Sequence, residues 1–396
     1  MLQGYVHPDF WAVAKLLGRQ IPRSRPGGAA VCVYHRGEVV VDLWGGSRDE
    51  SGRPWEPDTL ALSYSTTKGV TSTLLHLMVD RGLLDYDDPV VNHWPEFAQC
   101  GKEGITLRHI LCHEAGLYGI RSLVDHGRRM LEWDYMVEAL ADSIPAHAPG
   151  EAHGYHALTF GWLVGELIQR VAGGSFTELL QTEIAQPLEL DGLHIGLPGD
   201  QMHRRAQLIP AAISRWAPSE RRIARIGLPL HRALRLTRLP INLSEAASAM
   251  VPRGMDEVDF NSEGFAAVPI PSANGMFTAR SLAKLYATLA NGGEWQGQRL
   301  ISRATLRRAA EVQNRGIGRV IPFPMHWRLG YHRVPTLRVK VPRGFGHFGF
   351  GGSGGWADPD RNLSVAMVLN SGTGTPFGDV RMVRIGSAAA RCADRR

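Results

Sequence analysis

Lysine, cysteine and long apolar runs are all scarce in this sequence of 396 residues. Of the 44 basic side chains only five are lysines, so a lysine in a special context stands out against 39 arginines. The four cysteines have no metal-like spacing and predict free thiols rather than a disulfide framework. No apolar stretch is long enough to span a membrane, and the first residues lack the basic-then-apolar pattern of a secretory signal. We therefore expect a cytoplasmic protein without a transmembrane helix.

The net charge of +6 is concentrated in one segment. Between Arg204 and Arg238 lie nine arginines and one acid, Glu220, so this segment carries +8 and the rest of the chain −2. Apolar residues and prolines alternate with the arginines. Three interpretations of the segment follow. It binds to an anionic membrane surface, it caps a hydrophobic substrate pocket, or it is a folded insertion whose arginines are solvated. No nucleic-acid-binding motif accompanies the charge, so we expect no nucleic-acid partner.

Strand patterns lie at both ends of the chain, with helical patterns between them. The β-branched runs 29–34 and 38–44 predict a hairpin, and strand character returns at 345–349, 355–357 and 362–370. Helices are expected over 8–21, 161–171 and from about residue 378, with further helical patterns throughout 86–200. The pattern predicts an α/β (α+β) fold, in which helices flank an antiparallel sheet built from both termini and an all-helical domain is inserted. We expect a discontinuous sheet domain (1–85 and 263–396), a helical domain (86–200) and an Arg-rich insertion (201–262) that caps the cleft.

The stretch from Ser63 to Val79 carries the strongest signal for chemistry. Apolar residues recur at helical spacing from Thr66 onward, so Ser65 is expected at a helix N-terminus with Lys68 one turn away on the same face. A serine hydroxyl needs a base to become a nucleophile. A lysine is such a base once burial and nearby positive charge lower its pKa, whereas an arginine does not deprotonate. The alternative is an N-capping serine beside a surface lysine.

Two other serines compete with Ser65. About 0.3 Ser-x-x-Lys matches are expected by chance in a chain with so few lysines. The second match, Ser281 with Lys284, lies in an amphipathic helical pattern, and we interpret it as scaffold with a solvated lysine. Ser353 lies in a G-x-S-x-G pattern that is typical of a nucleophile elbow, but a turn and a strand follow where that motif needs a helix. We therefore expect Ser353 not to be the nucleophile.

Two loops are further candidates for the site. Tyr155 follows Pro149-Gly150 on a turn-rich loop, where its phenol either faces a cleft as a proton shuttle or simply packs. The glycine-rich segment 346–355 either exposes backbone N–H groups to an oxyanion or forms a tight strand corner. The three histidines between positions 147 and 156 lack a carboxylate or cysteine that would complete a ligand spacing, so no metal and no cofactor are predicted.

Together these residues resemble a known family. Ser65-x-x-Lys68, Tyr155, and His347-x-Gly349 on a late strand occur in the order of the three motifs of the serine β-lactamase and penicillin-binding-protein superfamily. With its framing segments, the chain is similar over nearly its whole length to the class C β-lactamase-like esterases called family VIII carboxylesterases. The resemblance implies an α/β sandwich domain and a helical domain, with the active site in the cleft between them. The framing segments are 41–46, 106–117, 274–275 and 291–293.

The resemblance also implies roles for individual residues. Ser65 would be the acylated nucleophile, Lys68 its base, and Tyr155 the proton shuttle that later activates water. The backbone N–H groups of Ser65 and Phe350 would form the oxyanion hole, with His347 and Gly349 beside them.

Two departures from the family pattern favour esters over lactams. Ala157 stands where the lactamases have an asparagine, and His347 stands where they have a lysine, so the lactam would lose an amide and keep only a weaker, pH-dependent carboxylate anchor. We predict a serine hydrolase that cleaves short to medium-chain acyl esters. The alternatives are a β-lactamase or D-Ala-D-Ala peptidase and, in another class, a non-catalytic binding protein that retains the cleft. The sequence does not indicate an oligomeric state.

Overall fold

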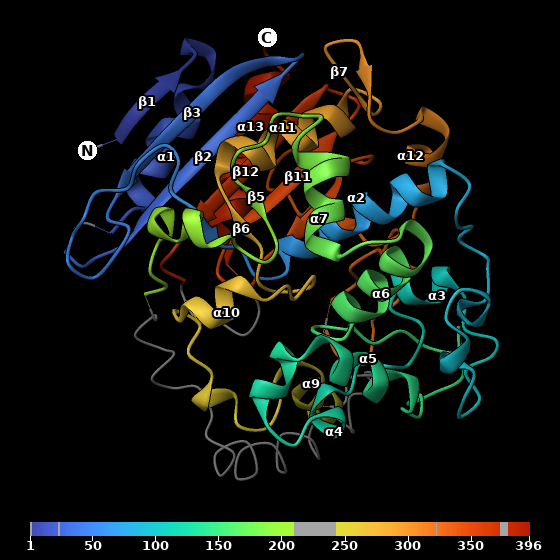
Figure 1. The fold of residues 1–396 in the computed structure, drawn as a ribbon. Coiled ribbons are helices and arrows are strands. Elements are labelled where there is room, and N and C mark those ends of the chain that lie inside the picture. The colour runs from blue at the N-terminus through green and yellow to red at the C-terminus, as the bar shows by residue number, and fades with distance from the viewer. Residues whose placement is uncertain (1, 23, 210–242, 322, 373–378) are drawn as a thin grey trace, which may run out of the picture.

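Seven antiparallel strands form the central sheet of the computed structural model, which describes all residues except 1, 23, 210–242, 322 and 373–378. The strand order is β1-β3-β2-β12-β11-β10-β9, so three strands from the N-terminal end meet four from the C-terminal end (Figure 1). This confirms the predicted sheet built from both termini. The strands are β1 (Leu2–Val6), β2 (Gly28–His35), β3 (Glu38–Gly46), β9 (His332–Arg333), β10 (Phe345–Phe348), β11 (Gly354–Asp358) and β12 (Leu363–Leu369).

The junction between the two chain ends is the pairing of β2 with β12. Val31 lies opposite Met367 and Val33 opposite Val365, and all four side chains are buried. Every residue of β12 is buried, because helices cover both faces of the sheet at this point. Such strands read as continuous apolar runs rather than as an alternation.

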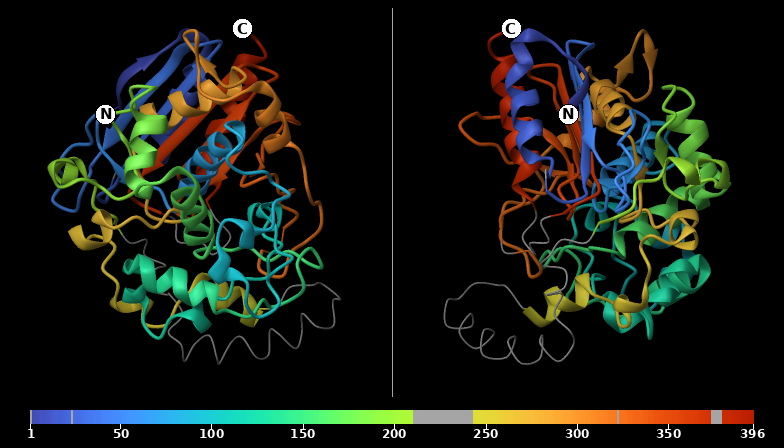
Figure 2. Two further views of the ribbon diagram at one scale, coloured as in Figure 1. Left: turned by 45° about the vertical axis from the view of Figure 1, so that its right-hand side comes forward. Right: turned by 90° about the vertical axis from the view of Figure 1, so that its left-hand side faces the viewer.

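Helices pack on each side of the sheet. On one face α1 (Trp11–Gln20) lies beside α13 (Val380–Ala393), as the right-hand view of Figure 2 shows. On the other face α11 (Ala279–Ala290) packs on β2, β11 and β12, and α2 (Thr66–Asp80) packs on β10. The predicted helices over 8–21 and from about residue 378 are confirmed as α1, preceded by a short 3-10 turn, and α13.

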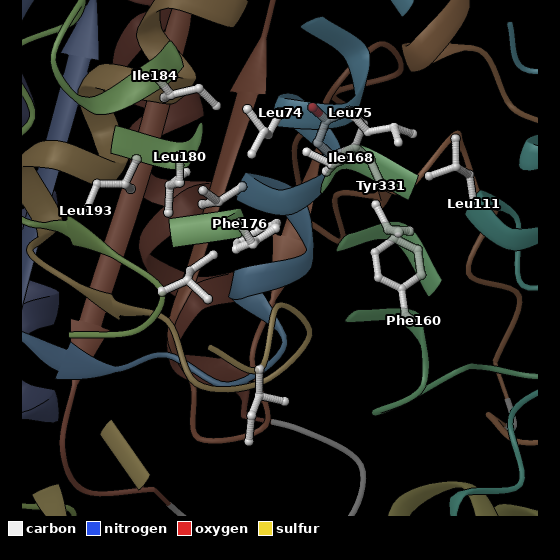
Figure 3. Close-up of a cluster of buried hydrophobic side chains, with 14 of the residues drawn as sticks. Leu74, Leu75, Leu111, Phe160, Ile168, Phe176, Leu180, Ile184, Leu193 and Tyr331 are labelled. Atoms are coloured by element: carbon white, nitrogen blue, oxygen red, sulfur yellow. The ribbon is translucent and has the colours of Figure 1, made fainter. Parts of the chain in front are cut away.

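Helix α2 joins the sheet to the helical part of the chain. All its residues but the last are buried, and its apolar face packs on α6 in a core shared with α7 (Figure 3). A helix enclosed in this way holds its first turn rigidly. The helices of this part are α3 (Leu107–Leu111), α4 (Ile120–Leu123), α5 (Trp133–Ala141), α6 (Phe160–Ala172) and α7 (Phe176–Leu180), and those that follow are α9 (Leu243–Met250), α10 (Glu263–Ala267) and α12 (Arg303–Ala310).

The short strands lie outside the central sheet. They pair in the order β4-β6-β5 and as the hairpin β7-β8. Their bounds are β4 (Ala61–Leu62), β5 (Leu193–His194), β6 (Met276–Phe277), β7 (Glu294–Trp295) and β8 (Gln298–Arg299).

Most of the Arg204 to Arg238 segment lies outside the described residues. Its first member, Arg204, is buried and donates to the backbone oxygens of Asp58 and Asp191, so this arginine is structural rather than solvated. No helix among the residues placed in the structure is long and apolar enough to cross a membrane.

Candidate active site

Ser65 occupies the N-cap of α2, as predicted, and its side chain is half-buried. The residue before it, Tyr64, has a φ of 45°, in the left-handed region that a tyrosine rarely adopts. The Thr67 hydroxyl holds this conformation by donating to the Tyr64 carbonyl at 2.5 Å. The Tyr64 ring meets Phe350 edge-on, with centroids 5.9 Å apart. The sharp bend at Tyr64 therefore separates strand from helix at the point where Ser65 is presented.

Lys68 is fully buried one turn further along α2. Its Nζ lies 2.6 Å from the carbonyl oxygen of Ala157, 2.9 Å from that of Ser272 and 3.3 Å from the Ser65 Oγ. Burial lowers the pKa of the Lys68 amine well below its ordinary value. A neutral amine has two N–H donors and one lone pair. Because the two carbonyls take both donors, the lone pair is left facing the Ser65 hydroxyl.

Tyr155 lies next to both Ser65 and Lys68 and is also buried. Its ring centroid is 5.0 Å from the Lys68 Nζ. Burial raises the pKa of the Tyr155 phenol above its ordinary value, and a hydrogen bond with the Ser65 side chain works against that rise. Trp327 stacks on the Tyr155 ring at 5.4 Å and an interplanar angle of 7°. The structure thus brings Ser65, Lys68 and Tyr155 together.

The end of β10 runs against the N-terminus of α2. At Gly349 a Cβ would lie 2.3 Å from the carbonyl oxygen of Ser63, so only glycine permits this approach. The next residue, Phe350, has a half-exposed ring. Neither the Ser65 N–H nor the Phe350 N–H has a hydrogen-bond acceptor in the part of the chain that the structure describes. Both donors are therefore available to a ligand.

His347 differs from its expected behaviour as a pH-dependent cation. Its side chain is 2% exposed, and its Nδ1 lies 3.1 Å from the Phe348 carbonyl. Its Nε2 has no partner among the residues described. Burial lowers the pKa of His347 well below its ordinary value, helped by His332 and Lys68. The imidazole is neutral near pH 7 and supplies no positive charge.

The competing serines have structural roles in the fold. Ser353 is buried, and its Oγ donates to the Ser63 carbonyl at 2.8 Å; strand β11 follows it where an elbow would need a helix. Ser281 is buried too, and its Oγ accepts from the Gly192 N–H at 3.0 Å. Its partner Lys284 is less solvated than expected, because its Nζ lies over the Trp295 ring at 5.6 Å.

Three residues near the site were not singled out from the sequence. Ser272 contributes only a backbone oxygen, which has no sequence signature. Trp327 has no motif around it. His113 lies in segment 106–117, which supported the resemblance, and that was the one available signal for it.

Comparisons with known proteins show the family to which the chain belongs. The family model described as Beta-lactamase matches residues 14–390. Esterase/beta-lactamase LipL of Mycobacterium tuberculosis is 37% identical over 371 residues, covering 93% of this chain and 82% of LipL. Two solved structures each give a TM-score of 0.85 and cover 99% of this chain and 100% of their own. One is a penicillin-binding protein homologue from Caulobacter crescentus, 34% identical, and the other a family VIII carboxylesterase, 33% identical. The chain belongs to the β-lactamase family.

Proposed function

We propose that this chain is a serine hydrolase that cleaves carboxylic esters through an acyl-enzyme on Ser65. The observation that carries the proposal is the buried Lys68 amine, whose two carbonyl partners leave its lone pair facing the Ser65 Oγ at 3.3 Å. The names of LipL and of the family VIII carboxylesterase support ester hydrolysis as the reaction.

The geometry supports a two-step mechanism. The Ser65 hydroxyl passes its proton to Lys68 as its oxygen attacks the ester carbonyl, and the N–H groups of Ser65 and Phe350 bind the oxyanion. Tyr155 delivers a proton to the leaving alcohol, which departs and leaves the acyl group on Ser65. Water then attacks the acyl-enzyme and gives a proton to the Tyr155 phenolate, the Lys68 ammonium returns its proton to the Ser65 oxygen as that bond breaks, and the acid leaves.

We propose that the acyl group is neutral and of short to medium length, and the apolar surroundings of Tyr155 support its neutral character. Tyr155 belongs to a small hydrophobic cluster separate from the two main cores. The half-exposed Phe350 ring, which contacts Tyr64 next to Ser65, adds apolar surface. The cluster consists of Tyr118, Tyr155, Ala249, Val320 and Trp327, with Ala157, Ala246, Ile321 and Met325 partly buried against it.

The same cluster bears on the Arg-rich insertion. We propose that residues 201–262 cap a cleft between the sheet domain (1–85 and 263–396) and the helical domain (86–200). Ala246 and Ala249 of α9, at the end of the insertion, pack in the cluster beside Tyr155, which supports a cap over the substrate more than contact with a lipid surface.

A β-lactamase or D-Ala-D-Ala peptidase is the second candidate, since the name of LipL gives beta-lactamase beside esterase. Labelling with a fluorophosphonate, followed by mass spectrometry of the labelled peptide, tests whether Ser65 is the nucleophile. A series of p-nitrophenyl esters assayed beside nitrocefin then decides between ester and lactam. Label on a different serine, or none in an active protein, would contradict the proposal.

A further inference from the structure

His113 accepts hydrogen bonds from the backbone N–H groups on both sides of Tyr155. Its carbonyl oxygen accepts from the Gly154 N–H at 2.9 Å, and its Nδ1 accepts from the His156 N–H at 3.2 Å. The residues immediately before and after Tyr155 are therefore both bonded to one residue of a distant segment.

The backbone of His113 has an unusual conformation that accompanies these two hydrogen bonds. It follows α3 with a φ of 63°, a left-handed conformation that is unfavourable for most residues but less so for histidine and asparagine. The side chain is 1% exposed. Because Nδ1 accepts a hydrogen bond, the proton of the neutral ring is on Nε2.

The His113 ring also limits the movement of the Tyr155 ring. Its centroid lies 4.9 Å from that of Tyr155, at an interplanar angle of 73°. It meets Trp327 edge-on at 4.3 Å, and Trp327 in turn stacks flat on Tyr155. Two hydrogen bonds to the flanking backbone N–H groups and two ring contacts thus hold Tyr155 in place. His113 makes both hydrogen bonds and one of the ring contacts, and Trp327 makes the other.

We propose that His113 is a positioning residue that holds the Tyr155 hydroxyl where it serves the reaction. The inference rests on the proposed function, and within it on the role of Tyr155 as proton shuttle. It assigns to His113 an effect on the step that needs the phenol rather than on substrate binding.

The test substrate is p-nitrophenyl butyrate, because p-nitrophenolate leaves without being protonated. Acylation then depends little on Tyr155, whereas deacylation still needs an activated water. Leucine at position 113 removes the Nδ1 acceptor, leaves the carbonyl acceptor, and disfavours the left-handed backbone conformation. A small displacement of a catalytic group lowers rates by about 100-fold. We therefore expect His113→Leu to lower kcat by about that factor and KM along with it, so that kcat/KM, which reports acylation, stays within threefold, and to accumulate butyryl-Ser65 visible in the intact mass.

Two further variants separate positioning from general destabilisation. His113→Asn keeps an acceptor oxygen where Nδ1 lies and tolerates the positive φ, so kcat should stay within about fivefold of the unmodified protein. His35→Leu removes an equally buried imidazole from β2 and should not accumulate the acyl-enzyme, whatever it does to the melting temperature.

A double-mutant cycle gives the sharpest result. Once Tyr155 is phenylalanine, misplacing the ring matters little, so adding His113→Leu should lower kcat by less than threefold. An equal loss in both backgrounds would overturn the proposal, as would normal turnover per labelled site in His113→Leu. If His113→Leu does not fold, a loss of more than tenfold in folded His113→Asn would overturn it. Ester hydrolysis by Ser65→Ala would instead overturn the proposed function; inactive Ser65→Ala with normal His113→Leu would overturn this inference alone.

Discussion

The Lys68 Nζ lies 2.6 Å from the carbonyl oxygen of Ala157, two residues beyond Tyr155. One hydrogen bond thus ties the base on α2 to the loop that carries the phenol. Because His113 accepts hydrogen bonds from two N–H groups of the same loop, α2, the Tyr155 loop and segment 106–117 form one connected assembly. Substitutions in any of the three parts should therefore act on the same reaction steps.

The first prediction concerns which serine reacts. Ser65→Ala should abolish ester hydrolysis, because among the residues that the structure describes the Lys68 lone pair faces no hydroxyl but that of Ser65. Ser353→Ala should keep activity within tenfold but lower stability by about 1 kcal/mol, since the Ser353 Oγ only bonds the Ser63 carbonyl and Thr66. Steady-state kinetics and chemical denaturation measure the two effects. Loss of activity in Ser353→Ala alone would reverse the assignment.

The second prediction concerns the base. Lys68→Arg should lower kcat/KM by about a thousandfold, because a guanidinium stays protonated and general-base catalysis is worth 10²–10⁴. In the unmodified protein, kcat/KM should rise as pH rises through the pKa of Lys68, which lies well below that of a free lysine, and then level off. Lys284→Arg is the matched control and should retain activity. A folded, active Lys68→Arg would exclude Lys68 as the base.

The third prediction compares ester with lactam. A β-lactam keeps its ring amine and carboxylate in the site after acylation, whereas an ester releases its alcohol. The site has alanine at 157 and a neutral imidazole at 347, and each charge-assisted hydrogen bond lost is worth about 1.5–3 kcal/mol. We expect kcat/KM for p-nitrophenyl butyrate to exceed that for nitrocefin by at least about 100-fold. His347→Lys should raise nitrocefin turnover while leaving ester turnover within a few-fold.

Comparable rates on the two substrates in the unmodified protein would favour the lactamase alternative. An unchanged nitrocefin rate in folded His347→Lys would show that a cation at this position is not what limits lactam turnover.

The fourth prediction concerns stability at acid pH. Burial lowers the pKa of His76 and His156 to about 3 and that of His332 to about 4, against 6.5 for a free histidine. Between pH 6.5 and about 4 the unfolded chain binds protons that the folded one excludes. The stability is therefore full above pH 6.5 and decreases as pH falls, by about 1 kcal/mol per pH unit for each histidine.

Guanidinium denaturation at pH 7.5, 6, 5 and 4.5 measures this slope. His76→Gln should make it shallower, whereas His203→Gln, at an exposed position, should leave it unchanged. A free energy of unfolding that stays constant over this range would contradict the prediction.

The fifth prediction concerns the close approach of β10 to α2. Gly349→Ala places a Cβ 2.3 Å from the Ser63 carbonyl oxygen, so backbone must shift and carry the Phe350 N–H with it. We expect a loss of about 1–3 kcal/mol in stability and at least about tenfold in kcat. Gly264→Ala, where a Cβ meets no atom within 4 Å, is the control. Normal kcat in Gly349→Ala would argue against Phe350 as an oxyanion donor.

Much of the scaffold could be predicted from sequence periodicity. Apolar patterns in the sequence predicted the helix after Ser65 and the strands at 29–34, 38–44 and 362–370. These patterns are clear because each of these elements is largely buried. Strand β1 was not predicted, because it is an edge strand whose three central residues are exposed. An element that buries so little leaves no apolar pattern.

The chemical environment of the site was harder to predict from the sequence than the identity of its motif residues. The motif places Lys68 beside Ser65, but its neutral state depends on burial by segments far away in sequence. His347 was expected to be a pH-dependent cation, but its burial by distant segments keeps the imidazole neutral. The sequence does not show this burial. The contacts of Trp327 and His113 with Tyr155 arise only when three separated segments pack together.

The pairing of β2 with β12 also constrains the order of events during synthesis. The β2–β3 hairpin leaves the ribosome well before its partner strand β12, because the whole helical part of the chain and α11 are synthesised between them. Until then β2 has an unpaired apolar edge, which is the kind of surface that aggregates or recruits chaperones. The nascent polypeptide therefore completes its central sheet, and with it the support beneath the nucleophile, only after β12 has emerged.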